Sequence, residues 1–252
     1  MIRRHAFDVD LRVPSGATNG YRVDSLLVDP AGSAQDIVDS VNTVEVSDIV
    51  LTHTHADHAG GVATAAERTD ATVWSHARHV DAFETTTGVE PDRTFRAGDT
   101  VGPATVVETP GHARDHVALR VDDDYLSGDL VFGADVGSTF VGGEGADMRA
   151  YVTSLRRLYA RDPDTLYPGH GPPIEDPRGR IADLLAHRRE RERSIERAVG
   201  EGARTVDEIL DAVYEKDLGD FRRLAALTIE AHLDKLAVEG RVAWDGERAD
   251  PT

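Results

Sequence analysis

The stretch Thr52-His53-Thr54-His55-Ala56-Asp57-His58-Ala59-Gly60-Gly61 places three imidazoles and one carboxylate within six consecutive residues. It directly follows the apolar run Asp48-Ile49-Val50-Leu51, which has the character of a short buried strand. A strand that ends in this pattern presents several nitrogen and oxygen ligands on one short loop. Such a ligand set is what a catalytic site for one or two divalent metals requires.

Three later segments repeat the same arrangement of an apolar run, then glycine or proline, then a single ligand-type residue. They are Thr109-Pro110-Gly111-His112, Ser127-Gly128-Asp129 and Pro168-Gly169-His170-Gly171. Each ligand-type residue would therefore lie where a strand ends. Because loops held by a rigid sheet can place side chains accurately, we expect the four segments to converge on one edge of the protein.

The four segments, in this order, resemble the metallo-beta-lactamase superfamily over roughly residues 15 to 180. The resemblance implies two metal sites built from seven ligands: the first held by His53, His55 and His112, the second by Asp57, His58 and His170, and both bridged by Asp129. It implies two Zn²⁺ per chain, with iron or manganese as alternatives. Two metals about 3.5–4 Å apart would lower the pKa of a shared, bridging water towards about 7. Asp57 would orient that water and is the expected catalytic residue.

The remaining histidines divide into one candidate and five that carry no site. His116 lies four residues beyond His112, so it is either a partner that orients a metal ligand or a plain structural residue. The other five have no ligand-type neighbours in the sequence, and we expect structural roles for His5, His76, His79, His187 and His232.

Strands that alternate with helices predict an α/β fold. Strand-like runs occupy residues 21–28, with a tight turn within the run, 71–75, 117–121 and 125–126, and a helical pattern covers 61–68. The resemblance makes the fold concrete: an αββα four-layer sandwich of two mixed sheets with the metals at one edge. A boundary near the proline-rich residues 172–177 predicts a catalytic domain over 1–177 and a second domain over 178–252.

The tail after this boundary has helical spacing throughout and a short strand near its end. Apolar residues lie on one face of a long helix that begins near Ile181, and Thr205-Val206-Asp207-Glu208 is a capping-box signature. A helix over 221–238 and a strand over 241–244 complete the outline of a winged helix. This tail resembles the branch of lactamase-beta-like endoribonucleases, whose members carry a small C-terminal winged-helix-like domain.

The charge balance is strongly acidic, with 46 acidic and 28 basic residues and a net charge of −18. Two residues only, Lys216 and Lys235, are lysines, and the chain has no cysteine, so disulfides and thiolate ligands are excluded. This composition is what we expect of a cytoplasmic protein from a salt-loving organism, with an acidic protein of an ordinary high-GC organism as the alternative. No export signal or membrane-spanning window is visible, so we expect no membrane partner.

Four functions fit these observations. The branch implies a dinuclear zinc hydrolase of phosphodiesters in single-stranded RNA, and the same ligands suit a thioesterase of the glyoxalase II type. A single-iron persulfide oxygenase and a non-enzymatic winged-helix module are further alternatives, although the complete ligand set argues against the last. The substrate is accordingly a small molecule or single-stranded RNA, and a homodimer stays open.

Two features leave the substrate undecided. Residues 180–252 carry 13 basic and 17 acidic residues, whereas nucleic-acid binding normally relies on positive charge. The arginine run over 188–193 is either a phosphate contact or a helix face that pairs with its own glutamates. The loops 16–21 and 29–32 depart from the branch's pattern, and both border the substrate edge in the family.

Overall fold

The structure, a computed structural model, describes residues 1–11, 13–41, 45–214 and 218–252. The chain divides into two compact units. The first comprises residues 1–109, 115–138 and 162–180, and the second comprises 110–114, 139–161 and 181–252. Among the helices of the described residues, none combines the length and the apolar character that a membrane span requires.

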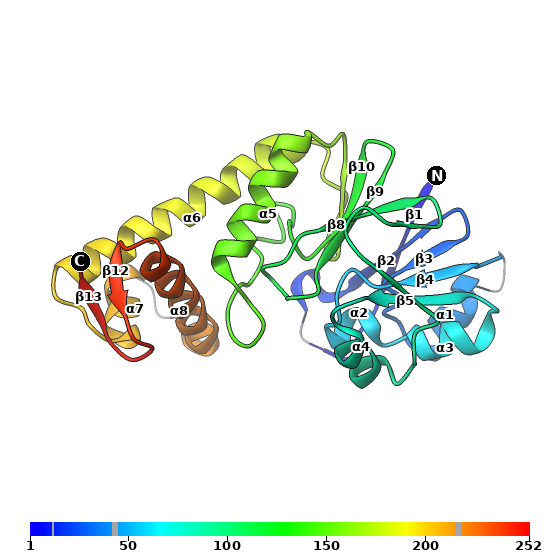
Figure 1. The fold of residues 1–252 in the computed structure, drawn as a ribbon, viewed down its shortest axis with the longest axis horizontal. Helices are drawn as coiled ribbons and strands as arrows, with labels where there is room; N and C mark the ends of the chain where they lie inside the picture. Colours follow the sequence, from blue (N-terminus) through cyan, green and yellow to red (C-terminus); the bar gives the residue numbers. More distant parts are fainter. Residues whose placement is uncertain (12, 42–44, 215–217) are drawn as a thin grey trace. The chain divides into compact units, whose positions relative to one another are not determined.

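The first unit contains a six-stranded mixed sheet whose strands follow one another in sequence order (Figure 1). The first three strands pair antiparallel, and the third to the sixth pair parallel. The strands are β1 (Ile2–Phe7), β2 (Thr18–Val23), β3 (Leu26–Val28), β4 (Asp48–Val50), β5 (Thr72–His76) and β6 (Arg93–Phe95). Parallel pairing requires crossover connections, which here contain helices α1 (Ala34–Val41), α2 (Ala56–Ala59), α3 (Val62–Arg68) and α4 (Val80–Thr87).

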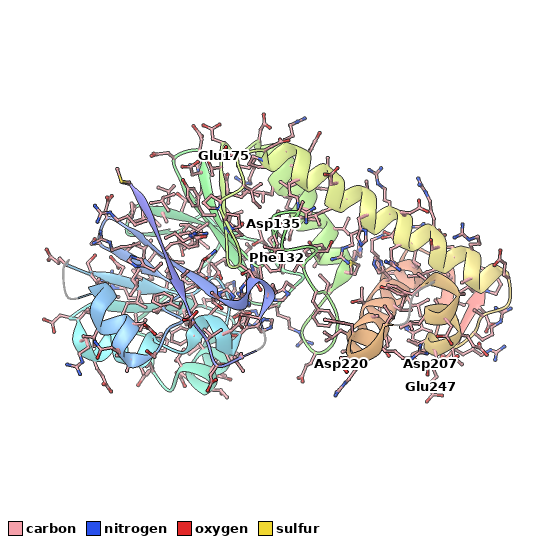
Figure 2. The ribbon with its side chains drawn as sticks, turned by 180° about the vertical axis from the view of Figure 1, so that it is seen from behind. Phe132, Asp135, Glu175, Asp207, Asp220 and Glu247 are labelled. Atoms are coloured by element: carbon pink, nitrogen blue, oxygen red, sulfur yellow. The ribbon has the colours of Figure 1, made fainter. Side chains whose placement is uncertain are left out.

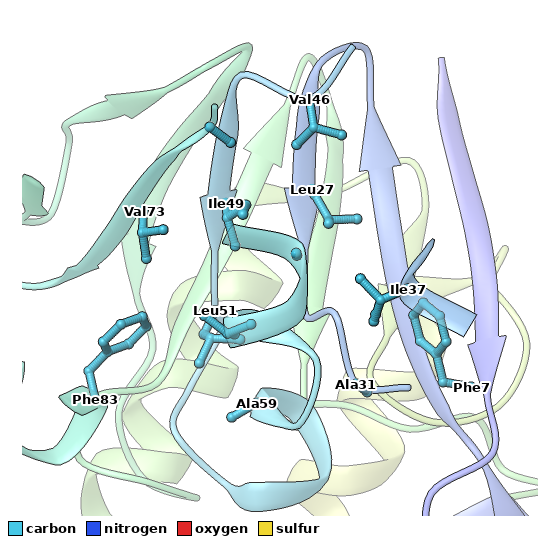
Figure 3. Close-up of a cluster of buried hydrophobic side chains, with 13 residues drawn as sticks. Phe7, Leu27, Ala31, Ile37, Val46, Ile49, Leu51, Ala59, Val73 and Phe83 are labelled. Atoms are coloured by element: carbon cyan, nitrogen blue, oxygen red, sulfur yellow. The ribbon is translucent and has the colours of Figure 1, made fainter. Parts of the chain in front are cut away.

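Helices α1, α3 and α4 cover one face of this sheet through a hydrophobic core. Figure 3 shows Leu27, Ile49 and Val73 of the strands facing Ile37 and Phe83 of the helices, all at most 2% exposed. Successive residues of the central strands are apolar, without alternation, because both faces of the sheet are buried.

The other face packs against a second sheet of five strands in the order β11-β10-β9-β8-β7. The pair β10 and β11 is parallel and the remaining pairs are antiparallel. The strands are β7 (Thr100–Val101), β8 (Ala104–Glu108), β9 (Val117–Val121), β10 (Asp124–Gly128) and β11 (Leu166–Pro168). One cluster joins side chains of both sheets, including Leu26, Phe95, Val106 and Leu119, so the two sheets form a sandwich.

The second unit is mainly helical. Its helices are α5 (Met148–Arg161), α6 (Pro177–Gly200, from Ile181 onwards), α7 (Val206–Val213), the 3-10 turn η2 (Gly219–Phe221) and α8 (Arg222–Val238), and its two strands are β12 (Val242–Trp244) and β13 (Ala249–Pro251). The predicted capping box is present: the Thr205 hydroxyl accepts from the Glu208 backbone, and the Glu208 carboxylate accepts from Thr205 N. A hydrophobic cluster that includes Ile195, Leu210 and Leu233 joins α6, α7 and α8.

The strands predicted at 21–28, 71–75 and 117–126 are present, as are the helix over 61–68 and the helical tail. The tight turn expected within 21–28 lies at Asp24, which has a φ of 53°, and it divides the run into the antiparallel strands β2 and β3. The predicted boundary between residues 177 and 178 lies at the first residue of α6 and stays a prediction.

Candidate metal centre

The loop after β4 and the four-residue helix α2 carry the dense group of histidines. His53 and His58 are buried, at 1% and 0% exposure, whereas His55 is exposed and Asp57 is partly exposed. His53 Nε2 lies 3.0 Å from His55 Nδ1, so the His-x-His pair turns two ring nitrogens toward one point. The exposed members leave this edge of the first unit open to a substrate.

Residues from three strand ends of the first unit meet at this place. His58 Nε2 lies 3.2 Å from Asp129 Oδ1 and 3.6 Å from Asp57 Oδ2. His170 Nε2 lies 3.4 Å from Asp57 Oδ2 and 3.5 Å from Asp129 Oδ2. Within this unit two sets of three residues have ligand atoms within 4.8 Å of one another, namely His53, His58 and Asp129, and Asp57, His58 and His170.

The donor set of this cluster fits a divalent cation. The Nε2 atoms of His58 and His170 are fully buried and make no hydrogen bond of ordinary geometry to any described residue, although carboxylates face both. A buried nitrogen without a partner is costly unless another group binds it. Two such nitrogens beside two carboxylates form the mixed N and O environment that zinc and similar metals prefer.

Each of these two histidines is fixed through its other ring nitrogen. His58 Nδ1 lies 3.0 Å from Asp29 Oδ2, and His170 Nδ1 lies 2.9 Å from the carbonyl oxygen of Ala17. A carboxylate or carbonyl oxygen accepts a hydrogen bond from Nδ1–H, so the Nε2 lone pair points into the cluster. Phe132, labelled in Figure 2, places its ring edge-on to His170, with 5.3 Å between the ring centroids.

The carboxylates draw positive charge into this buried region. Burial lowers the pKa of His170, but the contacts with Asp129 and Asp57 outweigh it and raise that pKa to about 9. Burial also lowers the pKa of His58, yet the charges of Asp129 and Asp29 hold it well above its ordinary value. For Asp57, burial raises the pKa, and His170 and His58 together bring it below its ordinary value. The carboxylates therefore favour a positive charge at this place. A bound metal ion would supply that charge and leave the two imidazoles neutral.

Asp29 contacts a candidate metal ligand, His58, and the sequence reasoning missed it. It follows β3, has a φ of 49° and is 1% exposed. Its carboxylate accepts from the backbone nitrogen and from the hydroxyl of Thr52, both at 2.7 Å, besides its contact with His58. Asp29 thus connects β3 to the start of the histidine loop. Two features of the sequence could have pointed to Asp29. It follows a strand-like run, and it belongs to the loop 29–32, which departs from the family pattern.

His116, for which the sequence left open a ligand-orienting and a plain structural role, contacts the backbone of Asp129. Its Nε2 accepts from the backbone nitrogen of Asp129 at 3.0 Å, and its Nδ1 lies 2.8 Å from the hydroxyl of Thr109. Gly128 precedes Asp129 with a φ of 47°, and a Cβ there would lie 2.8 Å from His116 Nε2. A side chain at residue 128 would therefore displace the histidine that holds the Asp129 backbone.

The loop that carries His170 is held by the start of β2. The Asn19 amide donates to the carbonyls of Pro168 at 2.9 Å and Gly171 at 2.7 Å, and its backbone nitrogen donates to Gly169. A Cβ on Gly169 would lie 2.2 Å from Asp129 Oδ1, so only glycine allows this close approach.

His112, the seventh predicted ligand, belongs to the segment 110–114 of the second unit. There its Nδ1 lies 2.8 Å from the carbonyl oxygen of Phe140. A carbonyl at Nδ1 fixes the ring in the same way as Ala17 fixes His170. Its assignment to the first metal stays a prediction from the order of the motifs.

Comparison with protein families identifies the chain. The metallo-beta-lactamase superfamily matches residues 16–170, and the beta-lactamase associated winged helix domain matches residues 205–249. The chain therefore belongs to the metallo-beta-lactamase superfamily and is a hydrolase of that fold with a His/Asp cluster suited to a divalent metal. The predicted fold class, a mixed α/β sandwich with a C-terminal winged-helix domain, is confirmed.

Two relatives illustrate the range of the similarity. The chain is 32% identical over 213 residues to the beta-lactamase-like protein 2 homolog of Drosophila melanogaster, covering 78% of this chain and 70% of the relative. It is 28% identical over 249 residues to the atrochrysone carboxyl ACP thioesterase AgnL7 of Paecilomyces divaricatus, covering 90% and 76%. The superfamily is thus established, and the endoribonuclease branch within it is not distinguished.

Two solved structures show the same fold. A metallo-beta-lactamase family protein from Thermus thermophilus matches with a TM-score of 0.79 and 24% identity, covering 100% of this chain and 98% of that one. The protein TTHA1623, solved in a di-iron-bound form, matches with a TM-score of 0.56 and 29% identity, covering 71% and 96%. The first similarity extends over both units, which supports the confirmed fold class.

Proposed function

We propose that this chain is a dinuclear metal hydrolase that acts on thioesters. His53, His55 and His112 would hold one metal, Asp57, His58 and His170 the other, and Asp129 both. The observation that carries this proposal is the pair of buried Nε2 atoms, of His58 and His170, that face the carboxylates of Asp57 and Asp129. Zinc is the proposed metal, because imidazoles and carboxylates are the ligands of many catalytic zinc sites.

Two divalent cations at this place would supply Lewis acidity and a water acidic enough to react near neutral pH. The protein's own contribution is orientation. Asp57 is partly exposed, and its Oδ2 lies 3.4 Å from the Thr18 hydroxyl and 3.4 Å from His170 Nε2. Held in this way, Asp57 would accept a hydrogen bond from the attacking water and orient it toward the acyl carbon. Asp29 and Ala17 would keep the two imidazoles in the tautomer that this requires.

Two observations favour a thioester over RNA. The thioesterase relative matches 90% of this chain, so the similarity includes the tail as well as the metal motifs. The winged-helix segment 205–249 carries 11 acidic and six basic residues, and a polyanion would be repelled by such a balance. Cleavage of single-stranded RNA is the second candidate, because winged-helix domains and the tail motifs first pointed to it.

A hydrolysis panel on one metal-analysed sample tests the proposal. The panel would compare a short acyl thioester, single-stranded RNA and a bis-aryl phosphodiester at high potassium chloride, with metal content measured by mass spectrometry. We expect close to two zinc ions per chain and thioester turnover that Asp57→Asn reduces sharply. The exposed Asp70→Asn variant of the same unit serves as the matched control.

The outcomes separate the candidates. RNA cleavage without thioester turnover would replace the proposed substrate but keep the dinuclear hydrolase. A sample that holds one iron and no zinc, with full activity on a persulfide, would overturn the hydrolase assignment in favour of an oxygenase.

A further inference from the structure

A small cavity lies between helices α5 and α6, entirely within the second unit. It encloses about 130 Å³ and is lined by Val152, Arg156, Leu185, Arg188, Arg189 and Glu192. Three of the six residues are arginines, although the chain as a whole carries a net charge of −18. None of the six belongs to the candidate metal centre, so this cavity is a separate feature.

Arg188 is the central residue of the cavity. It is 4% exposed, one of its terminal nitrogens donates to the carbonyl of Thr139, and its guanidinium lies 5.2 Å from the ring of Tyr151. Its Nε atom is buried and has no hydrogen-bond partner among the described residues. Leaving a charged donor unpaired in a protein interior is unfavourable, so an anion in the cavity would complete its hydrogen bonding.

The carboxylate of Glu192, which lines the cavity, is bound by two further cations, and these also pair with Glu196 and Glu239. Lys235 Nζ lies 2.9 Å from one oxygen of Glu192, and an Arg241 nitrogen lies 2.8 Å from the other. The pKa of the neighbouring His232 is held well below its ordinary value. Burial is the largest cause, and the positive charges of Arg188, Arg191 and Lys235 add to it. Counting the three arginines of the cavity with Lys235 and Arg241, five cations stand against the three carboxylates of Glu192, Glu196 and Glu239, so positive charge is in excess around Arg188.

The remaining members of the arginine run are accounted for by contacts along the helix. Arg193 pairs with Glu190 at 3.2 Å, one turn away on the surface, and the Arg191 guanidinium lies 4.0 Å from the ring of Tyr214. Only Arg188 and Arg189 of the run line the cavity, and Arg156 of α5 completes the set. The interpretation as a phosphate contact thus applies to Arg188 and Arg189, and the interpretation as a helix face paired with its own glutamates applies to Arg193.

We propose that this cavity binds the phosphate group of a small phosphorylated molecule. A volume of about 130 Å³ holds roughly four water molecules, which suits a phosphate group. Guanidinium groups match phosphate oxygens in pairs, so Arg156, Arg188 and Arg189 provide the recognition. Val152 and Leu185 provide an apolar wall for the carbon that the phosphate esterifies.

Calorimetric titration of the metal-loaded full chain with propyl phosphate tests the proposal. The double variant Arg156→Gln, Arg189→Gln changes two exposed residues and spares the buried Arg188, so the helices keep their core. We expect this variant to bind propyl phosphate about tenfold more weakly or worse. Arg157→Gln, an exposed neighbour on α5 that does not line the cavity, should bind like the wild type.

A second measurement reports on the buried residue directly. The Nε–H resonance of Arg188 should shift on addition of propyl phosphate and stay in place on addition of propanol. Inorganic phosphate serves as the comparison, and propyl phosphate should bind more tightly because its carbon chain contacts the apolar wall.

Several results would overturn the proposal. Phosphate that binds at the metal centre instead would give equal affinity in the double variant and the wild type. An unmoved Arg188 resonance, or the absence of saturable binding, would exclude the cavity as the site. Equal affinity for inorganic phosphate and propyl phosphate would show that the apolar wall does not contact the carbon chain, and the ligand would then not be a phosphate ester. None of the cavity residues belongs to the candidate metal centre, so thioester turnover can persist or fail independently of phosphate binding in the cavity.

Discussion

The chain buries ionisable groups in two places, and the two differ in how their charges are balanced. In the second unit Glu192 contacts Lys235 and Arg241, so anion and cations neutralise one another. In the first unit the Nε2 atoms of His58 and His170 face carboxylates and have no ordinary hydrogen bond within the described residues. The buried carboxylate of the second unit is paired with cations of the protein itself, whereas the two imidazole nitrogens of the first unit become paired when a cation binds.

The comparison shows why burial of charge by itself does not identify a catalytic site. A buried ion-pair network and a metal centre both collect acidic and basic residues and both perturb pKa values. They differ in geometry, because ligand atoms converge on one point in a metal centre, whereas each partner in a network contacts the next one in turn. Substitutions in the two clusters should therefore affect different properties.

Asp57→Asn should have the largest effect, and on turnover rather than on folding. The amide keeps the size of the carboxylate but removes the charge that holds and orients the water. We expect turnover to fall by about 10²–10⁴-fold, the usual contribution of a positioned acid or base group. Steady-state kinetics beside thermal melts would check this, with Asp70→Asn unchanged in both.

Retention of more than about a tenth of wild-type turnover in Asp57→Asn, with metal content unchanged, would show that another residue orients the water.

Lys235→Met should affect the other cluster, and stability rather than chemistry. Lys235 is 5% exposed, and its Nζ lies 2.9 Å from both Glu192 and Glu239. Its loss leaves Glu192 with Arg241, so we expect destabilisation of about 1–3 kcal/mol and no change in metal content. The exposed pair of Arg193 with Glu190 provides the control, because Arg193→Met should cost less than about 0.5 kcal/mol.

The two tryptophans allow the two units to be followed separately. Trp74 lies in the first unit and Trp244 in the second, and the chain has no other tryptophan. In a Trp74→Phe background, Lys235→Met should lower the midpoint of the unfolding transition that Trp244 fluorescence reports. If the shift appears only in the Trp74 signal of a Trp244→Phe background, the cluster does not stabilise the unit that contains it.

The sequence was sufficient for the strand ends and for the residues that meet there. The motif around His53 to His58 follows a strand with a clear apolar pattern, and Gly-Asp and Pro-Gly-His follow two others. Local periodicity and turn residues encode all of these. The capping box at Thr205 was predicted correctly for the same reason, since both of its members lie within four residues.

The supporting residues could not be predicted in this way. Asp29 contacts His58 across 29 positions of sequence, and the Asn19 amide contacts Pro168 across 149. Such contacts depend on how strands pair, and no local pattern reports that. The arginine run shows the same limit, because the distinction between Arg188 and Arg193 depends on the packing of α5 against α6.

Asp29→Asn should weaken metal binding without changing a metal ligand. The amide nitrogen would face His58 Nδ1, so donor would meet donor and the ring would lose its preferred tautomer. We expect the affinity for zinc to fall about 10–100-fold in competition with a chelator. Asp24→Asn is a close control, because Asp24 is exposed and shares the left-handed backbone, with a φ of 53° against 49°.

An unchanged zinc affinity in Asp29→Asn would mean that Thr52 and the loop backbone position His58 without this carboxylate.

The capping box of α7 should give the smallest effect, confined to the second unit. Thr205→Ala removes the acceptor for Glu208 N and should cost about 1 kcal/mol in unfolding followed by Trp244. The backbone hydrogen bonds from Arg204 and Thr205 lower the pKa of Glu208 below its ordinary 4.5. A carboxyl whose pKa is lower in the folded than in the unfolded state stabilises above the unfolded value, so this contribution is complete above about pH 4.5 and is lost as the pH falls through the lowered value. Glu208→Gln keeps an acceptor oxygen but does not titrate, so the difference in stability between wild type and variant should shrink on acidification. A difference that stays constant from neutral pH to below the lowered pKa would show that the ionised Glu208 does not contribute to the cap.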